Sequence, residues 1–175
     1  DFRPYRLGKK IETGAQFVQS QYCFDVPMFR DYMKKVRDLG FHEKCYILVG
    51  VGPLASAKTA KWIRSNVPGI HIPDSIIARL EGAADQKKEG KQLCIDIINE
   101  VKEIKGVSGI HVMAYRQEEY VAEIVHDSGV LKGRTPWKRE RNPGDDTVQQ
   151  RIEELKDGKT ENQEQMAETA AHHPH

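Results

Sequence analysis

Two polar side chains stand at the ends of strand-like segments, where ligands commonly bind. Gln21 lies at the end of an extended run from Gln16 to Tyr22, which follows a Gly-Ala turn and precedes an acidic helix start at Asp25. Arg116 follows a second run, from Gly109 to Tyr115, and precedes a helical pattern. In parallel α/β folds, ligands bind at the carboxyl ends of the strands. Their positions therefore make Gln21 and Arg116 candidate binding residues.

A glycine pair between a strand and a helix suggests a second kind of chemistry. Gly50 and Gly52 close an apolar run and precede a helical pattern, so backbone amides there could cradle a phosphate. The third glycine of the dinucleotide-binding fingerprint is absent, because Ala55 occupies its position. A tight turn between strand and helix is the favoured interpretation.

The cysteines and the C-terminal histidines give little indication of a metal or redox centre. Cys23, Cys45 and Cys94 are widely separated, and none forms the short C-x-x-C spacing of zinc and redox motifs. We expect three reduced core thiols. The terminal His172–His175 segment lies in a polar stretch and is a poor preorganised ligand set, so no physiological metal is expected.

The elements that position these residues alternate between strand and helix patterns. Apolar strand-like runs are each followed by a helical pattern, and this predicts an α/β fold with a parallel sheet of about three βα units. The expected strands are 16–22, 45–51 and 109–115, and the expected helices are 2–12, 26–39, 56–65, 72–80, 91–104 and 117–127.

Composition limits the partners and the compartment. The 27 Lys and Arg residues nearly balance the 26 Asp and Glu residues, so the net charge gives no reason to expect binding to nucleic acid or an acidic membrane. Apolar runs fall short of the roughly 20 residues of a membrane helix, and we expect a cytoplasmic protein.

Residues 1–132 are expected to form the folded domain, and residues 133–175 a charged, largely disordered tail. Because Asp1 replaces an initiator Met and a helical pattern follows at once, we expect the chain to begin inside a larger fold.

Several segments, in order from residue 3 to residue 131, resemble the C-terminal half of the methylenetetrahydrofolate reductase barrel. They are Arg3-Pro4-x-Arg6-Leu7-x-Lys9-Lys10-Ile11, Gly14-Ala15-x-Phe17-Val18-Gln19-Ser20-Gln21 with Phe24-Asp25-Val26, Gly50-Val51-Gly52-Pro53-Leu54, Ile72-Pro73 with Glu81-Gly82, and Val107-x-Gly109-Ile110-His111 ending at Arg116. The resemblance implies the last three strands of a (β/α)₈ TIM barrel. It also implies FAD as cofactor, NADH or NADPH as reductant, and methylenetetrahydrofolate as the folate substrate.

The family's functional residues map onto four positions of this chain. By resemblance, Gln21 bonds the folate pterin, for which an amide offers both donors and an acceptor. Arg116 lies at the substrate mouth, where it can steer the folate carboxylates. Lys10 lies close to the flavin phosphate and ribityl region, and Gln19 lies in the flavin-lining stretch through its backbone or its side chain. The catalytic glutamate is expected in the first half of the barrel, so no catalytic residue is assigned in this chain.

The chain also departs from the family pattern. Arg3 and Arg6 stand where some members place acidic or amide groups, and Ala57 stands where many carry an aromatic residue that packs on the folate. The Ala57 difference keeps open a related barrel that acts on another pterin or a methyl-transfer substrate.

A second alternative is a non-catalytic half-barrel subunit or interaction module. Three strands cannot close a barrel, so we expect the missing half, another chain or another copy in an oligomer to cover the open edges. The fragment alone is expected to be inactive.

Overall fold

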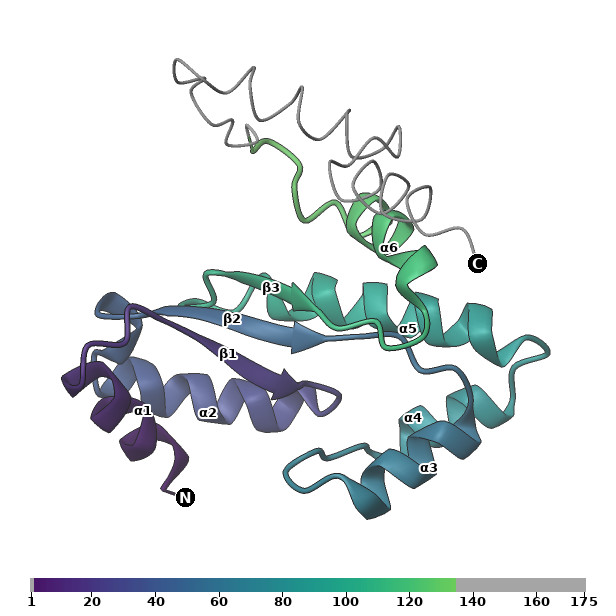
Figure 1. Ribbon diagram of the computed structural model, residues 1–175, viewed down its shortest axis with the longest axis horizontal. Coiled ribbons are helices and arrows are strands. Elements are labelled where there is room, and N and C mark those ends of the chain that lie inside the picture. The colour runs from purple at the N-terminus through teal and green to yellow at the C-terminus, as the bar shows by residue number, and fades with distance from the viewer. Residues whose placement is uncertain (1, 135–175) are drawn as a thin grey trace, which may run out of the picture. The chain divides into compact units, whose positions relative to one another are not determined.

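The computed structural model describes residues 2–134, so the predicted tail lies outside the described residues from residue 135 onward, together with the His172–His175 segment. The described chain contains three strands and six α-helices, and one or more helices separate each strand from the next (Figure 1). The order is α1 (Arg3–Glu12), β1 (Phe17–Tyr22), α2 (Val26–Asp38), β2 (Tyr46–Val51), α3 (Ala57–Asn66), α4 (Asp74–Glu81), α5 (Gln86–Val101), β3 (Gly109–Val112) and α6 (Val121–Asp127), with short 3-10 helices η1 (Phe41–Glu43) and η2 (Glu118–Tyr120).

The sheet has the order β1-β2-β3, and both pairings are parallel. Each strand is followed by at least one helix, so the predicted parallel α/β fold of three βα units is confirmed. The carboxyl ends of the three strands lie at the same edge of the sheet (Figure 1).

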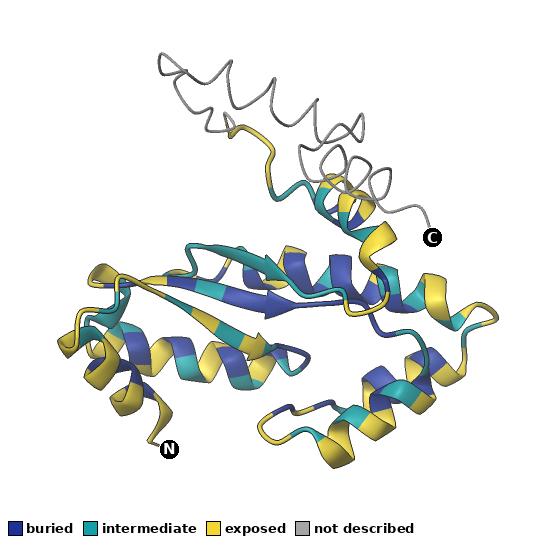
Figure 2. Ribbon diagram, viewed as in Figure 1, coloured by how far each residue is buried: buried dark blue, intermediate teal, exposed yellow. Residues whose placement is uncertain are grey.

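One face of the sheet packs on helices and forms the core. Ile47, Val49 and Val51 of β2 are at most 2% exposed and belong to one apolar cluster with Met33 of α2 and Ile98 of α5. Burying each such side chain contributes about 1.5–3 kcal/mol. The outward-facing residues differ sharply: Phe17 and Tyr46, which are register partners on β1 and β2, are 59% and 69% exposed (Figure 2).

Side-chain caps fix where the helices begin. Asp25 was expected to cap α2, and its carboxylate accepts the Met28 N–H at 2.9 Å. Ser56 accepts the Thr59 N–H at 3.1 Å, so α3 begins one residue after the expected position. Asp85 accepts the Lys88 N–H at 3.0 Å, and α5 therefore begins at residue 86 rather than at the expected residue 91.

The third strand and the last helix are shorter than expected. β3 ends at Val112, because its partner β2 ends at Val51 and only one further ladder bond follows, from the Met113 N–H to the Val51 carbonyl. The expected helix 117–127 is divided into η2 and α6. Arg116 lies in the turn between β3 and η2.

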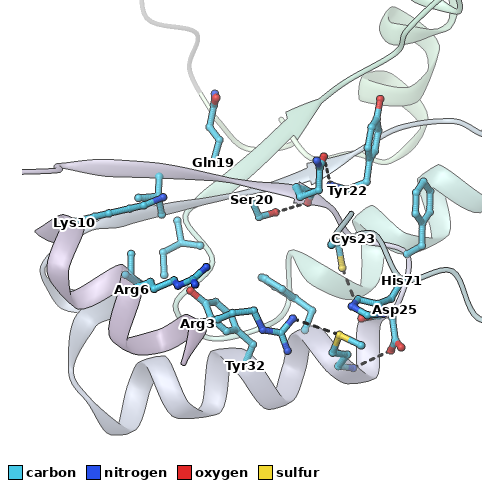
Figure 3. A pocket seen from close by; sticks show the side chains of 18 residues that line it. Arg3, Arg6, Lys10, Gln19, Ser20, Tyr22, Cys23, Asp25, Tyr32 and His71 are labelled. Carbon is cyan, nitrogen blue, oxygen red and sulfur yellow. Dashed lines mark hydrogen bonds between the residues drawn. The ribbon is translucent and has the colours of Figure 1, made fainter. Parts of the chain in front are cut away.

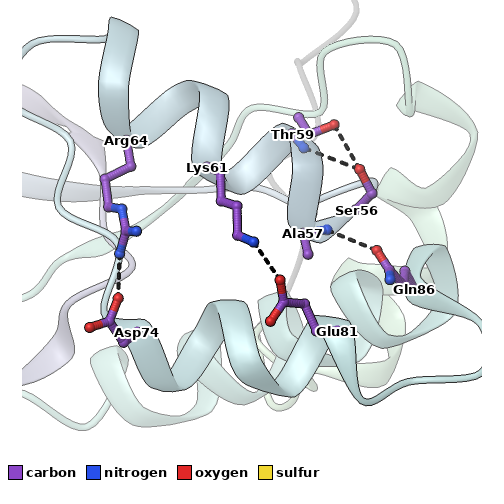
Figure 4. Close-up of polar contacts among 8 residues, drawn as sticks. All are labelled: Ser56, Ala57, Thr59, Lys61, Arg64, Asp74, Glu81 and Gln86. Carbon is purple, nitrogen blue, oxygen red and sulfur yellow. Dashed lines mark hydrogen bonds and ion pairs between the residues drawn. The ribbon is translucent and has the colours of Figure 1, made fainter.

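Ion pairs at the surface join the helices that follow β2. Arg64 of α3 contacts Asp74 at the start of α4 at 2.6 Å, and Lys61 contacts Glu81 at the other end of that helix (Figure 4). Such exposed pairs stabilise by at most about 1 kcal/mol each, so they align the two helices more than they hold the fold together. Within residues 2–134, no helix is both long and apolar enough to cross a membrane.

Candidate functional site

A cavity of about 310 Å³ lies between α1, β1 and α2. It extends along β1 to the carboxyl end of the strand, and Gly69 and His71 of the loop between α3 and α4 also line it (Figure 3). We call it the α1–β1 cavity. Its lining residues are Arg3, Arg6, Leu7, Lys10, Val18, Gln19, Ser20, Gln21, Tyr22, Cys23, Phe24, Asp25, Met28, Phe29, Tyr32, Ile47, Gly69 and His71.

Three of the four residues assigned by resemblance lie in this one cavity. Lys10 comes from α1, and Gln19 and Gln21 come from β1. Gln19 points to the opposite side of β1 from Arg3 and Arg6, so it lines the cavity through its backbone (Figure 3). Within this cavity Gln19 therefore presents its backbone and not its side chain.

Cations from α1 form one wall of the cavity. Arg3, Arg6 and Lys10 are spaced by three and four residues, which places them on one face of a helix, and Figure 3 shows them on the side facing β1 and α2. The Arg3 guanidinium donates to the Met28 sulfur at 3.7 Å. Arg6 and Lys10 have no ion-pair partner among residues 2–134, so their charges are available to an anion. We did not predict Arg3 and Arg6 as site residues, although their helical spacing from Lys10 was a usable signal.

A bulge in β1 sets the position of Gln21. Gln19 pairs with Leu48 and Tyr22 pairs with Gly50, so β1 carries one residue more than β2 over this stretch. The Ser20 hydroxyl takes the place of a backbone acceptor for the Gly50 N–H at 2.9 Å. The Gln21 carbonyl accepts from the Ser20 hydroxyl, and the Gln21 side-chain oxygen accepts the Tyr22 N–H at 3.0 Å. The amide nitrogen of Gln21 makes no hydrogen bond within the described residues, and it remains available as a donor.

The other polar groups of the cavity favour binding over covalent chemistry. Burial raises the pKa of the Cys23 thiol from 9.0 to about 12, and the nearby Asp25 and Glu100 carboxylates act in the same direction. Cys23 is therefore a neutral thiol and a poor nucleophile near pH 7. Burial also raises the pKa of Tyr32, against a lowering contribution from Arg3. The Asp25 carboxylate is engaged as the cap of α2.

Arg116 lies apart from this cavity, in the turn after β3. Its backbone has φ of 58°, a left-handed conformation that non-glycine residues seldom adopt. The Arg116 N–H donates to the Glu118 carboxylate at 3.1 Å, and its guanidinium lies 5.2 Å from the Tyr115 ring centroid. The side chain is exposed, so it is accessible to a ligand at the carboxyl edge of the sheet.

The glycine pair at the carboxyl end of β2, Gly50 within the strand and Gly52 just after it, serves close packing. A Cβ atom on Gly50 would lie 2.6 Å from the Met113 methyl group, and one on Gly52 would lie 2.1 Å from the Met113 carbonyl oxygen. This geometry agrees with the tight-turn interpretation and leaves no open cradle for a phosphate. Ala57, the first residue of α3, is only 5% exposed and its N–H donates to the Gln86 side chain at 2.9 Å (Figure 4). A buried alanine offers no surface for ring stacking, so this position does not replace the aromatic residue that many family members carry.

The cysteines and possible metal ligands of the described residues form no further site. Cys23, Cys45 and Cys94 are free and buried, as expected for core thiols. No group of three or more His, Cys, Asp or Glu side chains within residues 2–134 is arranged to hold a metal ion.

Comparisons with known proteins agree on one family. The family model described as methylenetetrahydrofolate reductase matches residues 4–129. A probable methylenetetrahydrofolate reductase (NADPH) of Caenorhabditis elegans is 26% identical over 146 residues, covering 78% of this chain and 22% of the relative. Methylenetetrahydrofolate reductase (NADH) 1 of Arabidopsis thaliana is 24% identical over 145 residues, covering 78% of this chain and 24% of the relative.

A solved structure supports the fold independently. An uncharacterized protein from Clostridium thermocellum, which binds two copies of 5-methyl-5,6,7,8-tetrahydrofolic acid, superimposes with a TM-score of 0.53 at 22% identity. The match covers 71% of this chain and 46% of that protein.

The matched curated relatives are much longer than this chain, which spans only 21% to 24% of their length. The family match itself extends over most of the chain, from α1 to the end of α6. The chain belongs to the methylenetetrahydrofolate reductase family.

Proposed function

We propose that the chain forms the C-terminal part of the barrel of a flavin-dependent methylenetetrahydrofolate reductase. The reaction is the reduction of 5,10-methylenetetrahydrofolate to 5-methyltetrahydrofolate with NADH or NADPH. The observation that carries the proposal is that Lys10, Gln19 and Gln21, assigned separately by resemblance, line one cavity beside the strand that delivers them.

The α1–β1 cavity fits part of an FAD molecule. Its α1 wall supplies the cations Arg6 and Lys10 for a diphosphate, and Val18, Leu7 and Phe29 supply apolar surface. At about 310 Å³ it has the size of a small ligand pocket, so the rest of a dinucleotide would contact the part of the barrel outside this chain. When bound, the flavin supplies the redox chemistry by taking a hydride from NAD(P)H and passing it to the methylene carbon of the folate.

Two residues of this chain are proposed to bind the folate. The free amide nitrogen of Gln21 can donate to an acceptor on the pterin edge, and the bulge in β1 fixes where that amide lies. The exposed guanidinium of Arg116 can pair with the folate carboxylates. The Clostridium thermocellum protein of similar fold binds a methylated tetrahydrofolate, and this supports a folate ligand here.

The remaining part of the barrel is proposed to complete the active site. The resemblance locates the catalytic acid in the first half of the family's barrel, and Cys23, Tyr32 and Asp25 offer no replacement for it in the cavity. In the described residues β1 and β3 are the edge strands, and each exposes one side to pairing. We infer that the other barrel strands, from the same polypeptide or a partner chain, cover these edges.

The two half-reactions test the proposal separately. In the full-length gene product, Gln21→Ala and Arg116→Ala should slow reoxidation of the reduced flavin by methylenetetrahydrofolate and leave reduction by NAD(P)H unchanged. Arg30→Ala is the matched control, because this exposed arginine of α2 lies outside the cavity and, among residues 2–134, pairs with Glu100 at the surface. Equal loss in both half-reactions, or no loss in either, would contradict the assignment of these residues to the folate.

A further inference from the structure

Tyr22 extends from β1 across the carboxyl end of the sheet to Met113, the residue after β3. Its hydroxyl donates to the Met113 carbonyl oxygen at 2.9 Å, a contact between residues 91 positions apart in the chain. Its ring stacks on Phe24 with a centroid separation of 5.5 Å and an interplanar angle of 13°. Tyr22 therefore links the two strands that do not pair with each other.

The glycines at the carboxyl end of β2 make this crossing possible. A Cβ atom on Gly52 would lie 2.5 Å from the Tyr22 ring and 2.1 Å from the Met113 carbonyl oxygen, so any larger residue would push the two apart. Gly50 similarly leaves room for the Met113 side chain. The absence of side chains at Gly50 and Gly52 thus leaves the space that Tyr22 and Met113 occupy.

Gln117 provides a second link at the same edge. It is only 6% exposed, and its side-chain amide donates at 3.2 Å to the carbonyl of Pro53, the residue after Gly52. The Gln117 backbone N–H donates to the Ala114 carbonyl at 2.8 Å. The turn that contains Arg116 is therefore anchored on one side through Met113 and on the other through Gln117.

We propose that Tyr22 and Gln117 are positioning residues that hold the Arg116 turn in register with Gln21. Tyr22 directly follows Gln21, and Gln117 directly follows Arg116. Both are held by hydrogen bonds near the carboxyl end of β2, Tyr22 to Met113 and Gln117 to Pro53. The left-handed backbone of Arg116 is strained, and such a conformation persists only where its surroundings enforce it. The link to the folate rests on the proposed function.

Hydrogen exchange tests the anchoring without any reference to activity. In the full-length gene product, Tyr22→Phe removes one hydroxyl and keeps the stacked ring. We expect faster amide exchange over residues 113–118. Tyr46→Phe is the matched control, because this tyrosine lies at the opposite end of β2 and its side chain is exposed. Gln117→Met, which keeps the side-chain length, should produce the same local increase as Tyr22→Phe.

Kinetics test whether the anchoring serves Arg116. Tyr22→Phe should raise the KM for methylenetetrahydrofolate about two- to tenfold, the range that corresponds to one hydrogen bond, with a smaller effect on kcat. In an Arg116→Ala background, Tyr22→Phe should have little further effect on KM, because residues that act through one another are not additive.

Different results refute the anchoring of the turn and the proposed function. Unchanged exchange over residues 113–118 in both Tyr22→Phe and Gln117→Met would overturn the proposal, and so would fully additive effects of Tyr22→Phe and Arg116→Ala. A protein that shows the exchange difference but no reoxidation by methylenetetrahydrofolate would refute the proposed function and support the anchoring of the turn.

Discussion

Lys9 and Lys10 are adjacent exposed cations at the end of α1, and only Lys10 lines the α1–β1 cavity. Both lie in the last turn of the helix, so replacing either by alanine removes the same favourable interaction with the helix dipole. Only Lys10→Ala removes a charge from the proposed diphosphate site. The comparison of the two variants therefore isolates ligand binding from helix stability.

The size of the effect follows from Coulomb's law. An exposed cation about 4 Å from an anionic oxygen contributes about 1 kcal/mol in water. This corresponds to a weakening of FAD binding by about fivefold for Lys10→Ala. Arg6→Ala with Lys10→Ala should weaken binding by about 25-fold if the two cations act independently. The differences should shrink at 1 M salt, where the screening length falls to about 3 Å.

Titration of the flavin-free, full-length gene product with FAD and with riboflavin provides the assay, read by flavin fluorescence. Riboflavin lacks the diphosphate, so its affinity should be equal in the Lys10→Ala and Lys9→Ala variants. An FAD affinity that Lys10→Ala leaves unchanged would refute the reasoning. Equal weakening of FAD binding by Lys9→Ala, or equal weakening of riboflavin binding by Lys10→Ala, would refute it as well.

Two further predictions concern the packing of the fold. Gly90→Ala on α5 would place a Cβ atom 1.7 Å from the Leu54 carbonyl oxygen, whereas Gly82→Ala would place it 3.4 Å from its nearest neighbour. Chemical denaturation should show a loss of about 1–3 kcal/mol or more for Gly90→Ala and a much smaller change for Gly82→Ala, and similar losses would contradict the packing. Burial raises the pKa values of the Cys23 and Cys94 thiols from 9.0 to about 12, so their contribution to stability is present below pH 9 and is lost as the pH rises toward 12. Mass spectrometry after iodoacetamide treatment at pH 8 should find both thiols unmodified in the folded protein and modified in urea, and rapid labelling of the folded protein would contradict their burial.

The sequence predicted the elements well wherever the signal was local. The strand patterns at 16–22 and 45–51 lie within one residue of β1 and β2, because alternating or continuous apolar runs report burial directly. The cap at Asp25 was also predicted, since a short acidic side chain before an amphipathic run has few other roles. The predicted start of α5 at residue 91 was wrong. The first turn of this helix is polar, so the Asp85 cap is the sequence signal that marks its start.

The candidate site was only partly predictable. Lys10, Gln19 and Gln21 were assigned from the resemblance, and their common cavity depends on the packing of α1 against β1. The contact from Tyr22 to Met113 depends on the register of all three strands and on the bulge after Gln19, and neither has a sequence signal. Arg3 and Arg6 depart from the family pattern, yet their spacing from Lys10 places them on the same helix face.

The most direct test of the central claim is an absorbance spectrum of the full-length gene product under anaerobic conditions. We predict a yellow protein that NADH or NADPH bleaches and that methylenetetrahydrofolate then reoxidises. A colourless protein that neither retains nor binds FAD would contradict the claim that this chain contributes to a flavin site.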